Sequence, residues 1–272
     1  MELYERNYLD GMTPAEEAEY ATILAKEKEG MNGFGRKNLY HLYPLAARNI
    51  LSLFPNHNLD ILDLKANDSA TIINEDFRQL LHSTSVGERE ILNYINRTPA
   101  FHIIGAILRG CQFRFGHHSA YLFPEFQLGT THKADYLLIG KNSGGHEFVF
   151  IELESPGNKG AGKVTIQDGE LGDVFRKGIT QVENWRRWLQ ENYLSLSEYF
   201  EKHKNLEESL PKEFLKYDDT RIHYIVIAGM RKNFSEKTYR IAREYRDTDK
   251  IQLLHYENLY DFSQQILDEP TY

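Results

Sequence analysis

The 272-residue sequence has a single cysteine, Cys111, which excludes an internal disulfide and a cysteine-based zinc site. It also lacks any apolar run of the eighteen or so residues that a membrane-spanning helix needs, and its N-terminus has no signal-peptide pattern. We therefore expect a cytoplasmic protein with no membrane partner. A basic surplus is missing too, because the net charge is −8; this counts against a protein that coats nucleic acid but leaves room for a locally basic cleft.

The composition is that of a folded, globular protein. Hydrophobic residues make up 41%, charged residues 26% and aromatic residues 12% of the chain, which argues against disorder. The length favours one catalytic-sized core with an appendage. We expect a mainly helical N-terminal region over residues 1–85, with a regulatory, sensing or assembly role, and a second domain over residues 86–272.

Helix signals dominate the N-terminal region. Thr13 as N-cap, Pro14 at the first helical position and Glu16 predict a helix that stops at Gly30. Further helices are expected across residues 39–54, interrupted by Pro44, and across residues 73–83, with a turn at residues 55–58 between them. The glycines of residues 33–35 are interpreted as turn residues, since a phosphate loop needs a lysine and a strand-to-helix context.

The second domain begins with a predicted helix and continues with strands. A capping box from Ser85 to Glu88 predicts the helix start. Residues 112–156 are rich in aromatic and branched side chains and predict three or four strands, with the clearest turn at residues 141–145. Cys111 lies in the strand-like "CQFRFG" and is expected to be a small core residue.

The C-terminal part alternates helices and strands. A long amphipathic helix is predicted within residues 173–200, with one apolar face, and a strand–helix–strand–helix order follows over residues 222–267. The expected fold class is α/β of the α+β type, a mixed sheet flanked by helices. The predicted apolar face of the long helix consists of Ile179, Val182, Trp185, Trp188 and Leu189.

Two glutamates end the strand-like segment "EFVFIELESP". Glu152 and Glu154 are two residues apart and so share a face with Phe148 and Phe150. A polar face turned to water is one explanation, but a buried charge is costly unless it is paired or binds metal. Pairing across the predicted turn brings Asp135 close to Glu152. Converging carboxylates suit Mg²⁺, and Mg²⁺ suits phosphodiester hydrolysis.

The order of these segments resembles a known family. The spacing of Asp135, Glu152 and the position two further on looks like the PD-(D/E)xK nuclease motif. More closely, "PEFQLGTTHKADYLLIG", "FVFIELESP", "QVENWRRWL", "IVIAG" and "LLHYENL" are similar, in that order, to the Shedu family of bacterial anti-phage nucleases. This resemblance spans about residues 88–267.

The resemblance implies a restriction-endonuclease-like core that cleaves or nicks DNA with Mg²⁺ or Mn²⁺. It also implies a homo-oligomer, for example a tetramer, and an N-terminal region that responds to a phage-derived trigger. Carried over by position, Glu125, Asp135 and Glu152 are the expected metal ligands, and Gln181 is a helical glutamine that faces the site. Trp185, one turn after Gln181, is expected to be a packing residue of the same helix.

The sequence departs from the motif at its third position, where most nucleases of this class have lysine and this chain has Glu154. A glutamate can act as a base or an additional metal ligand, but it cannot stabilise negative charge. Lys177, one helical turn before Gln181, or Lys133, two residues before Asp135, could supply that charge. A solvated surface lysine explains each of them as well.

Other readings stay open at this point. Residues 156–188 hold a small local surplus of basic side chains that could meet a phosphate backbone or be a solvated loop. A glycosidase with two carboxylates would need a sugar cleft, and the histidines have no metal-binding spacing. The strongest rival is a catalytically silent nuclease fold that acts as a sensor or assembly module. The basic residues are Lys159, Lys163, Arg176, Lys177, Arg186 and Arg187, against Asp168, Glu170, Asp173 and Glu183.

Overall fold

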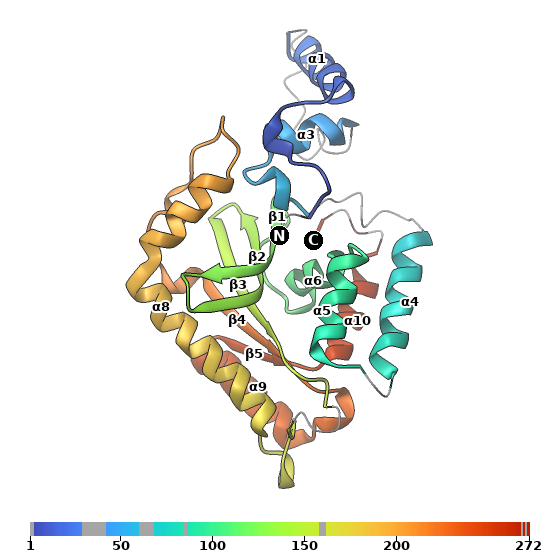
Figure 1. Ribbon diagram of the computed structural model, residues 1–272, viewed down its shortest axis with the longest axis vertical. Coiled ribbons are helices and arrows are strands. Elements are labelled where there is room, and N and C mark those ends of the chain that lie inside the picture. Colours follow the sequence, from blue (N-terminus) through green and yellow to red (C-terminus); the bar gives the residue numbers. More distant parts are fainter. Residues whose placement is uncertain are drawn as a thin grey trace.

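A mixed β-sheet forms the middle layer of the protein (Figure 1). The computed structural model describes residues 3–28, 42–59, 68–83, 86–157, 162–267, 269 and 271–272. Within them, five strands lie side by side in sequence order. Strands β1 to β3 are antiparallel, and β3, β4 and β5 are parallel. The strands are β1 (Ser119–Leu128), β2 (His132–Asn142), β3 (Gly145–Leu153), β4 (Ile222–Ile227) and β5 (Ile251–Leu254).

Strands β2 and β3 form the predicted hairpin. Asn142 pairs with Gly145, so the connection has two residues, and Gly145 has a φ of 114°, which a side chain would strain. At the other end the last pair is Tyr136 with Ile151. This register places Asp135 at the level of Glu152.

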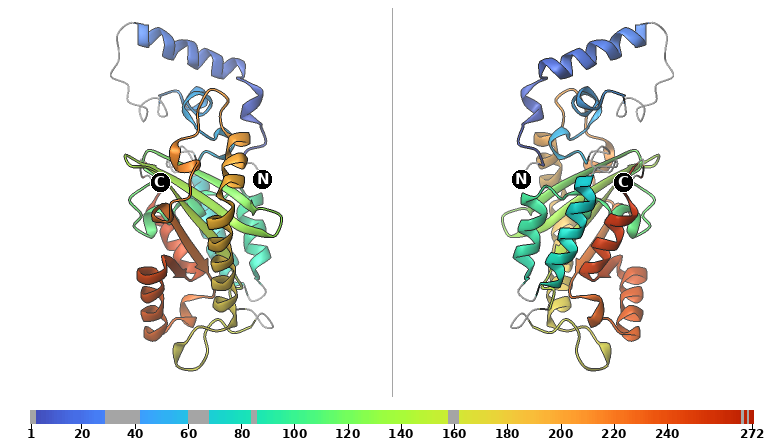
Figure 2. Two further views of the ribbon diagram at one scale, coloured as in Figure 1. Left: turned by 90° about the vertical axis from the view of Figure 1, so that its left-hand side faces the viewer. Right: turned by 90° about the vertical axis from the view of Figure 1, so that its right-hand side faces the viewer.

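Helices cover both faces of the sheet, which confirms the predicted fold class (Figures 1 and 2). Long helix α8 (Asp173–His203) and α9 (Glu236–Asp249) pack on one face, against Phe148 and Phe150. On the opposite face lie α4 (Asp68–His82), α5 (Glu88–Arg97), α6 (His102–Gly105), α7 (Ile107–Gly110) and α10 (Tyr256–Gln265). The predicted apolar face of α8 is buried, apart from the partly buried Trp188.

The N-terminal helices α1 (Pro14–Lys28) and α3 (Pro44–Leu51) project from one end of the sheet (Figure 2). The capping box of α1 is confirmed: the Thr13 amide donates to Glu16 Oε2 at 2.6 Å, and the Glu16 amide donates to Thr13 Oγ1 at 3.4 Å. The expected interruption at Pro44 is present: Leu42 is helical, Tyr43 is not, and a new helix starts at Pro44. This proline can begin α3, because the first turn of a helix needs no proline N–H. Gly30 and residues 33–38 lie outside the described residues.

Two predictions need correction. The N-cap of α5 is Gly87, whose amide donates to Glu90 Oε2 at 2.9 Å; Ser85 lies outside the described residues. Cys111 is not in a strand, because it ends α7 and Gln112 turns the chain with a φ of 57°. The partly buried thiol packs against the core, and burial raises its pKa to about 12.

Helix α4, from the N-terminal region, packs against α10 and α5. The division into residues 1–85 and 86–272 stays a prediction. None of the described helices has both the length and the apolar composition to cross a bilayer.

Candidate functional site

The carboxyl end of β3 carries two buried acidic side chains. Glu152 is 6% and Glu154 is 2% exposed, so they do not form a polar face turned to water. They follow Phe148 and Phe150 on the face that α8 covers. Burying carboxylates here is unfavourable unless other groups compensate them.

Helix α8 supplies such groups. Gln181 Nε2 donates to Glu152 Oε1 and, at 3.2 Å, to Glu154 Oε1. Lys177 Nζ lies 2.8 Å from Glu154 Oε2, while 61% of the lysine side chain stays exposed. Lys177 is thus an ion-pair partner of Glu154.

Gly178 lets α8 come this close to the sheet. A Cβ at this position would lie 2.6 Å from Val226 Cγ1 and 3.1 Å from Glu154 Cγ. The first distance is shorter than carbon atoms tolerate, and the second is tighter than most carbon–carbon contacts. The glycine between Lys177 and Gln181 therefore sets the depth at which their side chains meet the carboxylates.

Asp135 lies beside Glu152, as the hairpin register predicts. Its Oδ2 accepts a hydrogen bond from the Leu153 amide at 2.7 Å. Asp135 lies one residue before Tyr136, and Leu153 two residues after Ile151; Tyr136 and Ile151 form the last β2–β3 pair. The side chain thus takes the place of a ladder carbonyl where the two strands separate. This contact fixes the carboxylate at the strand end.

Burial and neighbouring acidic side chains raise the pKa of all three carboxyl groups. Burial, and then the charges of Glu88 and Glu154, raise the pKa of Asp135 against the Leu153 N–H bond. Burial, and then Asp135 and Glu154, raise the pKa of Glu152. Burial raises the pKa of Glu154 and Lys177 lowers it. Without a cation, the cluster therefore favours protonated carboxyl groups.

Glu125 does not join this cluster in the way expected. Its Oε1 lies 2.7 Å from Lys133 Nζ, and its side chain is 42% exposed. In the β1–β2 ladder it stands across from Asp135, and its φ of 50° is left-handed, a strained conformation for a residue that is not glycine. The other candidate for the missing positive charge, Lys133, therefore pairs with Glu125 and not with Glu154.

Glu88 was missed by the reasoning from the sequence. It is the first residue of α5, is partly buried, and its charge raises the pKa of Asp135, Glu152 and Glu154. It approaches the site from the face opposite α8. The only sequence signal at Glu88 was a helix start, and its distance along the chain from Asp135 left no spacing to detect.

The chemistry of these donors fits Mg²⁺ or Mn²⁺. Among the residues that the structure describes, no three acidic, histidine or cysteine side chains converge closely enough to hold a metal alone. Mg²⁺, however, often takes only one or two carboxylates together with water and substrate phosphates. Asp135 and Glu152 offer two, and their raised pKa values mean that a cation would relieve unfavourable charge.

The predicted basic surplus is spread over several surfaces. Lys159 lies outside the described residues, and Lys163, Arg176 and Arg187 are exposed. Arg186 donates to the carbonyl of Asp249, the last residue of α9. Of the members of this group that the structure describes, only Lys177 pairs with the acidic cluster.

Together these features define an α/β protein with a mixed sheet and a buried carboxylate site where β3 ends. Comparison with protein families gives the specific assignment: the chain belongs to the family described as Shedu protein SduA, C-terminal, whose model matches residues 85–260. The matched segment contains Glu88, Glu125, Asp135, Glu152, Glu154, Lys177 and Gln181. Membership implies a role in anti-phage defence. No curated protein matches the chain.

Proposed function

We propose that the protein is a divalent-metal-dependent DNA endonuclease that cleaves or nicks DNA in anti-phage defence. The observation that carries this proposal is the meeting of Asp135, Glu152 and Glu154 with Lys177 and Gln181 where β3 ends. This meeting lies inside the segment that the family model matches. The proposed partners of this endonuclease are DNA, a phage-derived trigger and further copies of the same chain in a homo-oligomer.

The proposed roles follow from the contacts. Asp135 and Glu152 would hold Mg²⁺ or Mn²⁺, which when bound neutralises phosphate charge and lowers the pKa of a water molecule. Gln181 orients the Glu152 carboxylate through its amide. Glu154 accepts the proton of the attacking water as the phosphorus–oxygen bond to the leaving group breaks. Lys177 supplies the positive charge that the motif lysine supplies elsewhere.

Glu125 is proposed as a third metal ligand, with one condition. Its carboxylate pairs with Lys133 in this structure, so it would have to exchange that partner for the ion. Exposed ion pairs of this kind contribute little stability, which keeps the exchange accessible.

The test is cleavage of supercoiled and linear DNA by the purified chain with Mg²⁺ or Mn²⁺, compared with Asp135→Asn and Glu152→Gln. Glu183→Gln, on an exposed part of α8, is the control. We expect metal-dependent cutting that both site variants lose and the control keeps. Cutting that both site variants retain would refute the assignment of these residues.

The rival function is a catalytically silent sensor or assembly module. Its support is Glu154 in the lysine position and the preformed pairing of Glu125 with Lys133. Calorimetry with Mn²⁺ separates the two functions. If Mn²⁺ binds the chain but neither DNA is cut, alone or with phage lysate, the silent module is favoured.

A further inference from the structure

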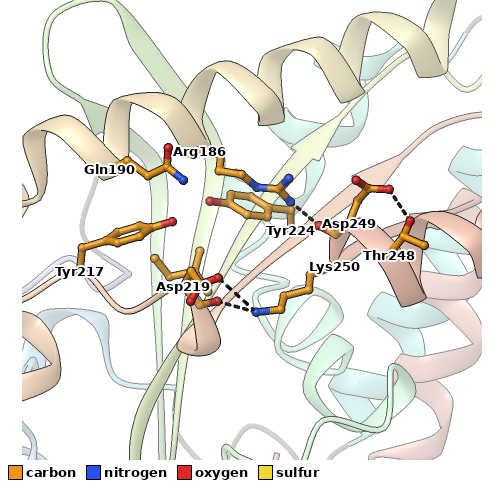
Figure 3. A pocket seen from close by; sticks show the side chains of 9 residues that line it. Arg186, Gln190, Tyr217, Asp219, Tyr224, Thr248, Asp249 and Lys250 are labelled. Carbon is orange, nitrogen blue, oxygen red and sulfur yellow. Dashed lines mark hydrogen bonds and ion pairs between the residues drawn. The ribbon is translucent and has the colours of Figure 1, made fainter.

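A second polar pocket lies at the opposite end of the parallel strands from the carboxylates. It has a volume of about 150 Å³ and opens between α8, the start of β4 and the end of α9 (Figure 3). Its floor is formed by Ile222 and Tyr224 of β4. The walls are Arg186, Gln190, Tyr217, Asp219, Thr248, Asp249 and Lys250.

A buried tyrosine hydroxyl faces this pocket. Tyr224 is 2% exposed, and among the described residues its hydroxyl makes no hydrogen bond of normal geometry, although the Arg186 side chain lies close enough to lower its pKa. Figure 3 shows the Tyr217 hydroxyl and the Gln190 amide turned toward the same space. A buried polar group that lacks a partner costs about 1–3 kcal/mol. Such a group facing a pocket therefore indicates a ligand that completes its hydrogen bonding.

The charges around the pocket leave donors in excess at its centre. Lys250 Nζ lies 2.9 Å from the Asp219 carbonyl and 3.8 Å from Asp219 Oδ2, which offsets that acid. The Asp249 carboxylate accepts from Thr248 Oγ1 at 2.5 Å and points away from the tyrosine hydroxyls (Figure 3).

Arg186 and Tyr224 complete the donor set. The Arg186 guanidinium lies over the Tyr224 ring, 4.9 Å from its centre, and uses one nitrogen for the Asp249 carbonyl. Burial raises the pKa of the Tyr224 hydroxyl, so it stays protonated and can donate at neutral pH. Two hydroxyls, an amide and a guanidinium around one space are the donors that bind oxyanions.

We propose that this pocket binds the oxyanion group, phosphate or carboxylate, of a small molecule, through Tyr217, Tyr224, Gln190 and Arg186. The site is separate from the proposed nuclease centre and does not rest on that function. Tyr224 lies near the amino end of β4, whereas Glu152 pairs at the level of Val226, toward its carboxyl end.

The experiment is isothermal titration calorimetry of the full chain with inorganic phosphate and, separately, with malonate. We expect saturable binding of one probe per chain, weakened at least tenfold by Tyr224→Phe and by Arg186→Gln. Arg187→Gln, the neighbouring arginine on α8, should leave binding unchanged. Binding of phosphate alone identifies a phosphate ligand, and binding of malonate alone identifies a carboxylate ligand.

Two controls keep the proposal falsifiable. Asp135→Asn should bind the same probe with unchanged affinity, because the carboxylate site lies elsewhere. Tyr224→Phe without any probe should keep or raise the melting temperature, since the removed hydroxyl makes no hydrogen bond of normal geometry among the described residues. The proposal is wrong if neither probe binds saturably, if Tyr224→Phe leaves binding unchanged, or if that variant melts several degrees lower.

Discussion

Glu152 shows at the scale of one residue how this site is built. It is a carboxyl group surrounded by apolar strand residues, three other acids and one glutamine. In a folded protein the charged form of such a buried group is unfavourable, and the neighbouring Asp135 carboxylate makes it less favourable still. The sequence keeps an arrangement that lowers stability in the absence of a cation, as functional sites often do.

We expect Glu152→Gln to stabilise the cation-free protein at pH 8 by about 1–3 kcal/mol, because the folded wild type must keep the Glu152 carboxyl protonated at a pH where the unfolded chain releases that proton, and an amide removes this cost. A raised pKa in the folded state means that the stabilising contribution is complete below the ordinary carboxyl pKa and is lost as pH rises through the raised value. The gain should therefore grow from pH 5 to pH 9. Urea unfolding at each pH, in a chelator, measures it; a variant less stable than wild type at pH 9 would contradict the electrostatic argument.

Lys177 sets the charge state of Glu154. Its removal in Lys177→Met should raise the pKa of Glu154 further, because the ammonium that lowers it is lost. DNA cutting should fall by about 10²-fold, the usual effect of losing one stabilising group, and the acidic limb of its pH profile should move to higher pH. Lys177→Arg should retain much of the activity. An unchanged pH profile in Lys177→Met would make the lysine a surface residue without a role in the site.

At the scale of elements, α8 decides whether the site forms. Its apolar face was predicted from helical periodicity, and this face also fixes the direction of Lys177 and Gln181. The closeness of the approach depends on Gly178, for which the sequence offers no local signal. A glycine within a helix is otherwise unfavourable, so its presence here has a packing cause.

Gly178→Ala should push α8 away from β3 and β4. We expect a loss of about 1–3 kcal/mol in the free energy of unfolding, as for other overpacked cores, and a larger proportional loss of DNA cutting. Thr180→Ala is the matched control on the same turn, because its hydroxyl bonds only the Arg176 carbonyl. If Gly178→Ala cuts DNA as well as the control does, the spacing between α8 and the carboxylates is not critical.

At the scale of the whole molecule, Asn205 joins the N-terminal region to the end of α8. Its side chain donates to the Asn49 carbonyl at 2.5 Å and to the Ser52 carbonyl at 3.4 Å. Its backbone N–H donates to the Leu53 carbonyl. It is a buried polar residue with satisfied donors. These bonds fasten the end of α3 and residues 52–53 to the segment that follows α8.

Asn205→Ala should leave the two carbonyls without these donors and cost about 1–3 kcal/mol. Residues 42–59 should then become more sensitive to limited proteolysis, while the hairpin of β2 and β3 stays protected. Lys202→Ala, at an exposed position near the end of α8, is the control and should be neutral. Equal proteolysis of the two variants would show that other contacts hold the segment.

The sequence predicts the parts of this molecule that depend on local periodicity. The α8 face, the hairpin turn and the alternation of Phe148, Phe150, Glu152 and Glu154 follow from spacing alone, and the register then places Asp135. The contributions of Glu88 and Tyr224 could not be predicted, because they depend on which elements pack together. Glu125 was expected among the ligands, yet its pairing with Lys133 is decided by backbone geometry at one residue.

Helix α8 has a consequence for communication within the molecule. Lys177 and Gln181 at one end, and Arg186 and Gln190 further along, lie on the same helical segment before the non-helical Asn192. A ligand that favours one axial position of this segment would change the affinity at the other end, and thermodynamic reciprocity would make the effect equal in both directions. The architecture thus places the proposed anion pocket and the proposed nuclease centre on one helical segment.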